Sequence, residues 1–135
     1  MGFSNSSIMP TIAVEDLDRA IAFYSDKLGF TVRKLEQDSG SALVEIGQWG
    51  RLLLYSSSFA RGETTAAAIL VDDVESAVRE LRGRGVTFEE YDFPGLKTVD
   101  GVATIGELKS SWFKDSEGNT LAISTDLSEL MRKAA

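Results

Sequence analysis

An internal repeat constrains the fold of this chain more than any other feature of its sequence. A short apolar stretch, a helical stretch and further apolar stretches run over about residues 8–58 and again over about residues 64–125. A shift of 57 positions pairs Val14 with Val71, Asp16 with Asp73, Leu17 with Val74, Ala20 with Ala77 and Ile21 with Val78. The repeat predicts an α+β fold in which two tandem βαβββ modules form one domain, residues 1–127. Residues 128–135 are expected to form a tail or a short helix.

The repeat also predicts where the two modules differ. Near the closing strands the shift is 68 positions, which pairs Gly50 with Gly118 and Ser56 with Ser124. The offset therefore grows within the second module, and we expect the extra residues to form an inserted loop over 91–101. The flanking segments 86–91 and 103–114 are each expected to be a strand.

The helix of the first module has clear start and stop signals. Apolar residues recur with helical spacing at Leu17, Ala20, Ile21, Tyr24 and Leu28. Asp16 stands where its carboxylate can cap the first turn, and Gly29 stands where a helix can end. The local signals therefore agree with the repeat.

The composition excludes several classes of protein. The chain has no cysteine and no histidine, which excludes disulfides, thiolate nucleophiles, imidazole metal ligands and Ser-His-Asp triads. The net charge of −7 argues against a nucleic-acid partner, which selects basic surfaces. We also expect no membrane partner, because no apolar run reaches the roughly 18 residues of a spanning helix. The N-terminus lacks a signal-peptide pattern, so the expected location is the cytoplasm.

Two motifs resemble one known superfamily. The segment "DLDRAIAFYSDKLGF" resembles the opening of a vicinal-oxygen-chelate module, and "WFKDSEGNTLAI" resembles its closing motif, with Ser116 in place of the usual proline. This superfamily includes glyoxalases, bleomycin resistance proteins and extradiol dioxygenases. The resemblance implies strands that curve into a cup, helices on the outer face, a ligand in the concave face, and a homodimer.

The resemblance also identifies four strand positions that carry the metal ligands in catalytic members. In this chain they hold Met9, Leu54, Ala66 and Ala122, and none of these offers a hard oxygen or nitrogen ligand. A slip of one residue at any strand still gives no ligand set. We therefore expect neither a metal nor another cofactor, and an apolar centre to the cup.

Alternation along the strands extends the candidate ligand-binding set. If the four positions above face the cup, then Thr11, Leu52, Ala68 and Thr120 face it too. The resemblance to extradiol dioxygenases adds Trp112, whose alternative role is packing in the core or at a dimer interface. Tyr91 and Phe93 are too apolar for an idle loop. They are expected to cover the cup or to contact a partner subunit.

These observations leave three functions open. The first is a metal-independent protein that binds an apolar or aromatic drug or metabolite. The second is a metal-free isomerase, lyase or cyclase, in which Glu45, Asp100 or Glu107 acts as a general base and Tyr91 as a proton donor. The third is an interaction module whose cup is filled by its own side chains.

Overall fold

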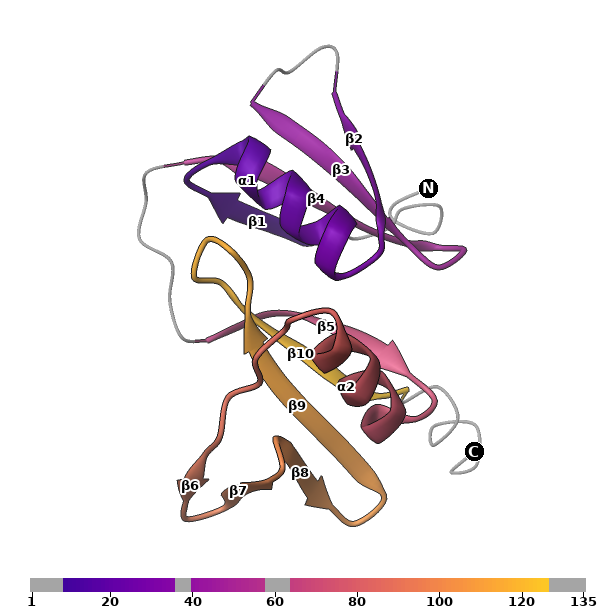
Figure 1. The fold of residues 1–135 in the computed structure, drawn as a ribbon, viewed down its shortest axis with the longest axis vertical. Coiled ribbons are helices and arrows are strands. Elements are labelled where there is room, and N and C mark those ends of the chain that lie inside the picture. Colours follow the sequence, from indigo (N-terminus) through magenta and orange to yellow (C-terminus); the bar gives the residue numbers. More distant parts are fainter. Residues whose placement is uncertain (1–8, 36–39, 58–63, 127–135) are drawn as a thin grey trace, which may run out of the picture. The chain divides into compact units, whose positions relative to one another are not determined.

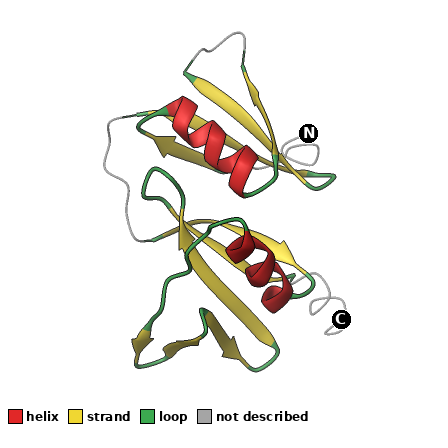
Figure 2. Cartoon of the chain, in the orientation of Figure 1, coloured by secondary structure: helices red, strands yellow, loops and turns green. Residues whose placement is uncertain are grey.

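The computed structural model describes residues 9–35, 40–57 and 64–126. The chain divides into two compact units, Met1–Arg61 and Gly62–Ala135. Each contains a mixed sheet with a helix on one face (Figures 1 and 2), so the predicted α+β fold of two βαβββ-type modules is confirmed. The predicted tail, 128–135, lies outside the described residues. Within them, no helix is long and apolar enough to cross a membrane.

Unit 1 follows the predicted order of elements. It contains β1 (Thr11–Val14), α1 (Leu17–Ala22), a π-helical turn (Phe23–Lys27), β2 (Thr31–Lys34), β3 (Ser41–Ile46) and β4 (Gly50–Ser56). The sheet order is β1-β4-β3-β2, and β1 runs parallel to β4. The predicted helix signals are confirmed, because Asp16 Oδ1 accepts a hydrogen bond from the Arg19 N–H at 3.0 Å and Gly29 has a φ of 76°.

The ion pair between β2 and α1 shows which face of the unit 1 sheet lies under the helix. Lys34 Nζ lies 2.8 Å from Asp18 Oδ1 of α1. Lys34 pairs with Ala42 on β3, and Ala42 pairs with Leu54 on β4. Paired residues on neighbouring strands point to the same side of a sheet. The core under α1 therefore includes Ile12, Val14, Ala42, Val44, Leu52 and Leu54.

This register corrects one sequence prediction. Leu52 and Leu54 were expected to share a face with Thr11, but Thr11 pairs with Leu53. Leu52 and Leu54 therefore point to the opposite face and are buried in the core. The prediction is wrong because strand alternation divides the residues of a strand into two sets, one for each face of the sheet. Alternation alone does not fix which set faces the helix.

Unit 2 repeats the plan and enlarges it. It contains β5 (Thr65–Val71), α2 (Val74–Gly83), β6 (Asp92–Phe93), β7 (Leu96–Val99), β8 (Val102–Ile105), β9 (Leu108–Lys114) and β10 (Thr120–Thr125). The sheet order is β5-β10-β9-β8-β7-β6, and β5 runs parallel to β10.

The inserted segment is more ordered than the sequence predicted. Instead of a loop over 91–101, β6 and β7 form a hairpin that continues the sheet beyond β8. The predicted single strand over 103–114 is two strands, because a turn at Gly106 separates β8 from β9. The predicted strand over 86–91 is reduced to an isolated bridge between Phe88 and Phe113.

Contacts of α2 distinguish the two faces of the unit 2 sheet. The Arg82 guanidinium lies 5.6 Å from the centre of the Phe88 ring, and Phe88 pairs with the fully buried Phe113. Phe113 therefore points toward α2. Its neighbour Trp112 points to the opposite face, where it pairs with Ala122, which in turn pairs with Ala68.

Candidate functional site

A cavity rich in aromatic side chains lies in unit 2, on the sheet face opposite α2. Its volume is about 390 Å³, and we call it the aromatic cavity. Its lining consists of Thr64, Thr65, Glu89, Tyr91, Phe93, Leu96, Trp112 and Lys114. Small-molecule sites combine apolar and aromatic walls with a few polar groups in this way.

Three aromatic rings form the wall of the aromatic cavity. The Tyr91 ring centre lies 5.5 Å from that of Trp112, with an angle of 71° between the planes. The Tyr91 ring centre also lies 5.5 Å from that of Phe93, with an angle of 34° between the planes. Trp112 Nε1–H donates a hydrogen bond to Thr65 Oγ1 at 3.1 Å. The indole is therefore tied to β5 while its apolar surface remains available to a ligand.

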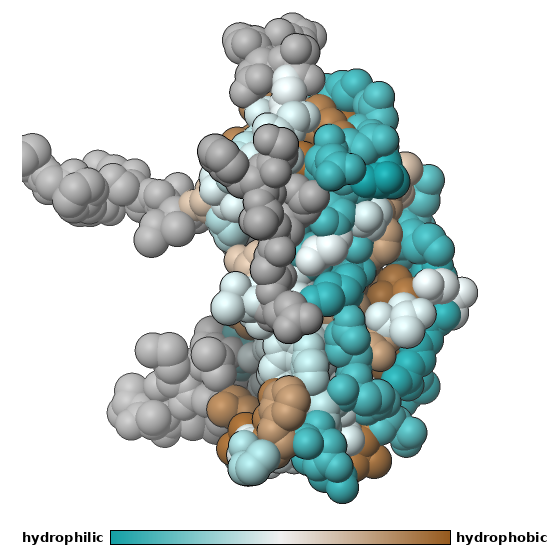
Figure 3. All heavy atoms as spheres, turned by 90° about the vertical axis from the view of Figure 1, so that its left-hand side faces the viewer, coloured by the Kyte–Doolittle hydropathy of each residue, from teal (hydrophilic) through white to brown (hydrophobic). Residues whose placement is uncertain are grey.

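The β6–β7 hairpin is held by the buried Thr98. Its Oγ1 accepts a hydrogen bond from the Tyr91 N–H at 2.8 Å and donates one to Glu90 Oε1 at 2.6 Å. The Thr98 N–H also donates to the Tyr91 carbonyl at 2.9 Å. Apolar side chains gather near this hairpin (Figure 3), and Phe93 is 55% exposed. The hairpin thus presents aromatic surface on a fixed backbone.

The candidate residues of unit 2 divide between the aromatic cavity and its surroundings. Tyr91, Phe93 and Trp112 line it. Thr120 is buried next to it, and its Oγ1 accepts a hydrogen bond from Lys114 Nζ. Ala122 is buried between its strand partners Trp112 and Ala68. Ala68 lines a separate cavity of about 230 Å³. Ala66 has no partner on β10, because the register of the β5–β10 pairing shifts there.

The candidates of unit 1 are not gathered into one place. Met9 precedes β1 and is 39% exposed. Thr11 is exposed, on the sheet face opposite α1, which it shares with Arg51, Leu53 and Tyr55 of β4. Leu52 and Leu54 belong to the core, as described above.

The three candidate acids lie apart from the aromatic cavity. Glu45 is in unit 1 and forms ion pairs with Arg33 and, at 3.8 Å, with Arg51. Asp100 has a φ of 53° in the β7–β8 turn, and Glu107 is exposed in the β8–β9 turn. None of the three acids lines the aromatic cavity, so their role as a general base stays a prediction.

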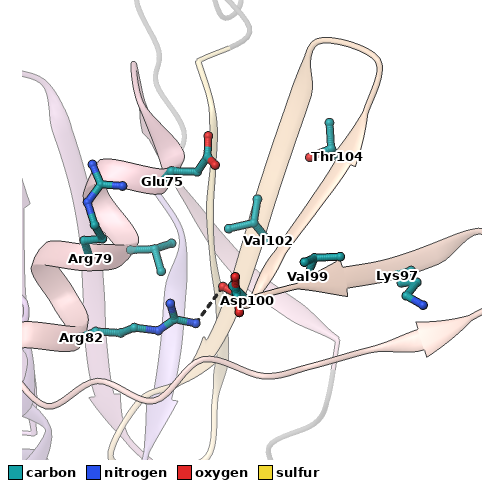
Figure 4. Close-up of a pocket in the computed structure, with 9 residues that line it drawn as sticks. Glu75, Arg79, Arg82, Lys97, Val99, Asp100, Val102 and Thr104 are labelled. Atoms are coloured by element: carbon teal, nitrogen blue, oxygen red, sulfur yellow. Dashed lines mark hydrogen bonds between the residues drawn. The ribbon is translucent and has the colours of Figure 1, made fainter.

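A larger cavity of about 590 Å³ lies on the α2 side of the same sheet, where Asp100 is found (Figure 4). Two of its charged side chains, Arg82 and Glu75, make structural contacts. Arg82 Nη2 donates to the Asp100 carbonyl at 2.8 Å, and Glu75 on α2 is paired with Lys109 on β9. These bonds attach α2 to the β7–β8 turn and to β9.

A divalent metal does not fit the residues at the four family positions. Met9, Leu54, Ala66 and Ala122 supply no oxygen or nitrogen side-chain ligand. Within residues 9–35, 40–57 and 64–126, no group of three or more aspartate or glutamate side chains is placed to hold an ion.

Two charged residues of the aromatic cavity were missed by the sequence reasoning. Lys114 follows Trp112 by two positions on β9, so strand alternation alone could have identified it. Glu89 lies in an irregular segment, and only its pairing reveals it: the Glu89 N–H donates to the Trp112 carbonyl at 2.7 Å.

Comparison with protein families gives a match over most of the chain. The model of the Glyoxalase/Bleomycin resistance protein/Dioxygenase superfamily matches residues 7–123. The chain is also 32% identical over 95 residues to a glutamate 5-kinase from Gluconobacter oxydans (strain 621H), an alignment that covers 67% of this chain. The chain spans 25% of the length of that curated relative.

Solved structures show the same fold at low sequence identity. A superfamily member from Sphaerobacter thermophilus is 21% identical with a TM-score of 0.68, over 89% of this chain and 98% of that one. A bleomycin resistance determinant encoded on transposon Tn5 is 18% identical with a TM-score of 0.67, over 90% and 98%. The fosfomycin resistance protein FosX from Mesorhizobium loti is 15% identical with a TM-score of 0.62, over 96% and 99%.

Proposed function

The chain belongs to the Glyoxalase/Bleomycin resistance protein/Dioxygenase superfamily, and from that premise we propose that it is a metal-independent small-molecule binding protein. The observation that carries the proposal is the aromatic cavity, in which Tyr91, Phe93 and Trp112 surround about 390 Å³. Aromatic rings offer a flat ligand a large apolar contact area at little conformational cost. The ligand is accordingly a flat aromatic molecule that lies against Trp112.

Two relatives by fold support a role in resistance. Their names refer to resistance to bleomycin and to fosfomycin, and sequestration of a drug is the role we propose first. Carriage of an aromatic metabolite is the second role, because fold alone does not select a ligand. The homodimer implied by the resemblance remains part of the proposal.

A neutral aromatic dye tests the proposal directly. N-phenyl-1-naphthylamine emits more strongly when it enters an apolar site, and we expect a saturable rise in its emission with this protein. Trp112→Ala removes one wall of the aromatic cavity and should weaken binding by about tenfold or more. Trp49→Ala is the matched control, because Trp49 is 82% exposed in a turn of unit 1.

Two results would overturn the proposal. One is an emission that does not saturate with the wild-type protein. The other is equal affinity in the wild-type protein and Trp112→Ala. Exhaustive dialysis against a chelator tests the metal independence, and we expect it to leave the affinity for the dye unchanged. Competition with antibiotics and aromatic metabolites then ranks the candidate ligands.

A further inference from the structure

Two opposite charges lie on either side of Trp112 in the aromatic cavity. Glu89 and Lys114 both line it. Glu89 is beside Trp112 on the neighbouring segment, since its N–H donates to the Trp112 carbonyl and the preceding Phe88 pairs with Phe113. Lys114 is two residues beyond Trp112 on β9 and therefore points to the same face.

The two charges do not neutralise each other. Glu89 and Lys114 occupy diagonal positions on adjacent segments, whose Cα atoms are roughly 7–8 Å apart in antiparallel pairing. Among the residues that the structure describes, neither side chain has an ion-pair partner within 4.0 Å. Lys114 Nζ donates instead to the uncharged Thr120 Oγ1. Lys114 Nζ thus keeps further hydrogen-bond donors for a ligand.

Charged groups elsewhere in the molecule are used differently. Glu75 on α2 is paired with Lys109, and Glu45 is paired with Arg33 and Arg51. In the aromatic cavity, by contrast, the partly buried Glu89 and Lys114 face the same space without a counter-ion among the described residues. Charges in such surroundings are stabilised by a partner that brings the opposite charge.

We propose that the ligand of the aromatic cavity is an aromatic zwitterion, a molecule with an amine and a carboxylate on one side of its ring. This inference rests on the proposed function and narrows its ligand class. The carboxylate accepts from Lys114, the ammonium donates to Glu89, and the ring lies against Trp112. Two charge-assisted hydrogen bonds of about 2.8 Å each, together with an amino-acid head group, can bridge two long side chains at diagonal positions.

Four related compounds test the charge pattern. Phenylalanine carries both charges, 2-phenylethylamine only the positive one, 3-phenylpropionate only the negative one, and 3-phenylpropionamide neither. The protein has two tryptophans, so a Trp49→Phe background leaves Trp112 as the sole indole whose emission reports binding. We expect phenylalanine to bind at least about tenfold more tightly than each of the three analogues, because charge-assisted hydrogen bonds are the stronger kind.

Two substitutions assign each charge to its residue. Glu89→Gln should reduce the affinity for phenylalanine toward that for 3-phenylpropionate and leave the latter unchanged. Lys114→Met should reduce it toward that for 2-phenylethylamine. Glu107→Gln and Lys97→Met remove the same charges outside the aromatic cavity and should leave the affinities as they were.

Each alternative outcome contradicts either the zwitterionic ligand alone or the zwitterionic ligand together with the proposed function. Equal affinities for the four compounds, or tightest binding of a singly charged or neutral one, contradict the zwitterion and leave the aromatic binding function standing. No response of Trp112 to phenylalanine, while N-phenyl-1-naphthylamine still binds, contradicts it as well. Failure of both phenylalanine and the dye overturns the inference and the proposed function together.

Discussion

The two units share one plan, but the sheet face opposite the helix is used differently in each. In unit 1 that face carries Thr11 and Leu53 and an ion cluster of Arg33, Glu45 and Arg51. In unit 2 the corresponding face carries Trp112 and the aromatic cavity. The repeat therefore fixes the scaffold, while the side chains of one face decide whether a unit offers an apolar site.

The insertion explains much of this difference. Unit 1 passes from its helical segment to β2 and β3 with short connections, whereas unit 2 adds the β6–β7 hairpin between α2 and β8. The added hairpin supplies Phe93 and Leu96, and the residue before it is Tyr91. An insertion at a sheet edge can thus create a binding wall without disturbing the core beneath α2.

The largest effect is expected in the core of unit 2. Phe113→Ala removes a fully buried ring that packs 5.5 Å from Phe88, and should lower the free energy of unfolding by about 3–5 kcal/mol. Urea denaturation followed by Trp112 emission in the Trp49→Phe background measures it. Phe93→Ala, at an exposed ring, should cost less than about 1 kcal/mol; equal losses in the two variants would contradict the face assignment.

The turns that close the two units give the next comparison. Asp115 is buried, and its carboxylate accepts from the Glu117 N–H at 2.8 Å, the Asn119 N–H at 2.9 Å and Asn119 Nδ2 at 3.0 Å. Asp115→Ala should therefore lower the free energy of unfolding by about 3 kcal/mol. Gln48→Ala in the exposed β3–β4 turn of unit 1 should change it by less than about 0.5 kcal/mol. Thermal denaturation of both variants measures these two changes, and equal changes would contradict the comparison.

A smaller effect is expected where the inserted hairpin is fixed. Thr98→Val removes the hydroxyl that bonds the Tyr91 N–H and Glu90, and should cost about 1–2 kcal/mol of stability. The affinity for N-phenyl-1-naphthylamine should fall as well, because the position of Tyr91 becomes less defined. Thr104→Val, at an exposed site on β8, is the control. Unchanged dye affinity in Thr98→Val would show that Tyr91 does not depend on this anchor.

A gain in stability is expected at the buried Ser111. In the described part of the chain its Oγ has no hydrogen-bond partner. Ser111→Ala removes an unsatisfied polar atom and should raise the free energy of unfolding by about 1 kcal/mol. Ser110→Ala, whose Oγ lies 3.0 Å from Ser124 Oγ, should lower it instead. Denaturation midpoints that move in the same direction would contradict this distinction.

The smallest effect is expected in unit 1. Glu45→Gln breaks the pairs with Arg33 and Arg51, and exposed ion pairs of this kind contribute about 0–1 kcal/mol. The affinity for aromatic ligands should not change, since Glu45 lies outside the aromatic cavity. A large loss of binding, or loss of a newly found activity, would instead support the metal-free enzyme considered from the sequence.

Local interactions explain why some expectations from the sequence hold. Asp16 and Asp73 cap the two helices through hydrogen bonds to residues three positions on, and such contacts depend on neighbours in the chain. The two modules were predictable for a related reason, because their apolar periodicity repeats in register. Tyr91 and Phe93 were identifiable as candidates because aromatic residues in an insertion need a partner surface, and Trp112 was identified through the resemblance to extradiol dioxygenases.

What the sequence could not provide depends on strand pairing. Leu52 and Leu54 were assigned to the wrong face because the alternation along β4 has two possible orientations. Glu89 was overlooked because its neighbour in space, Trp112, is 23 positions away in the sequence. The segment 91–101 was expected to be a loop because a two-residue strand such as β6 leaves no periodic pattern.

The sequence by itself determined the two βαβββ-type modules, the helix caps, and the lack of histidine and cysteine chemistry. Each of these depends on residue identity or on contacts between chain neighbours. The tertiary structure alone decided that Tyr91, Phe93 and Trp112 share one cavity and that Glu89 and Lys114 flank it. The physical reason is the register between strands, which sets the proximity of side chains that no local propensity connects.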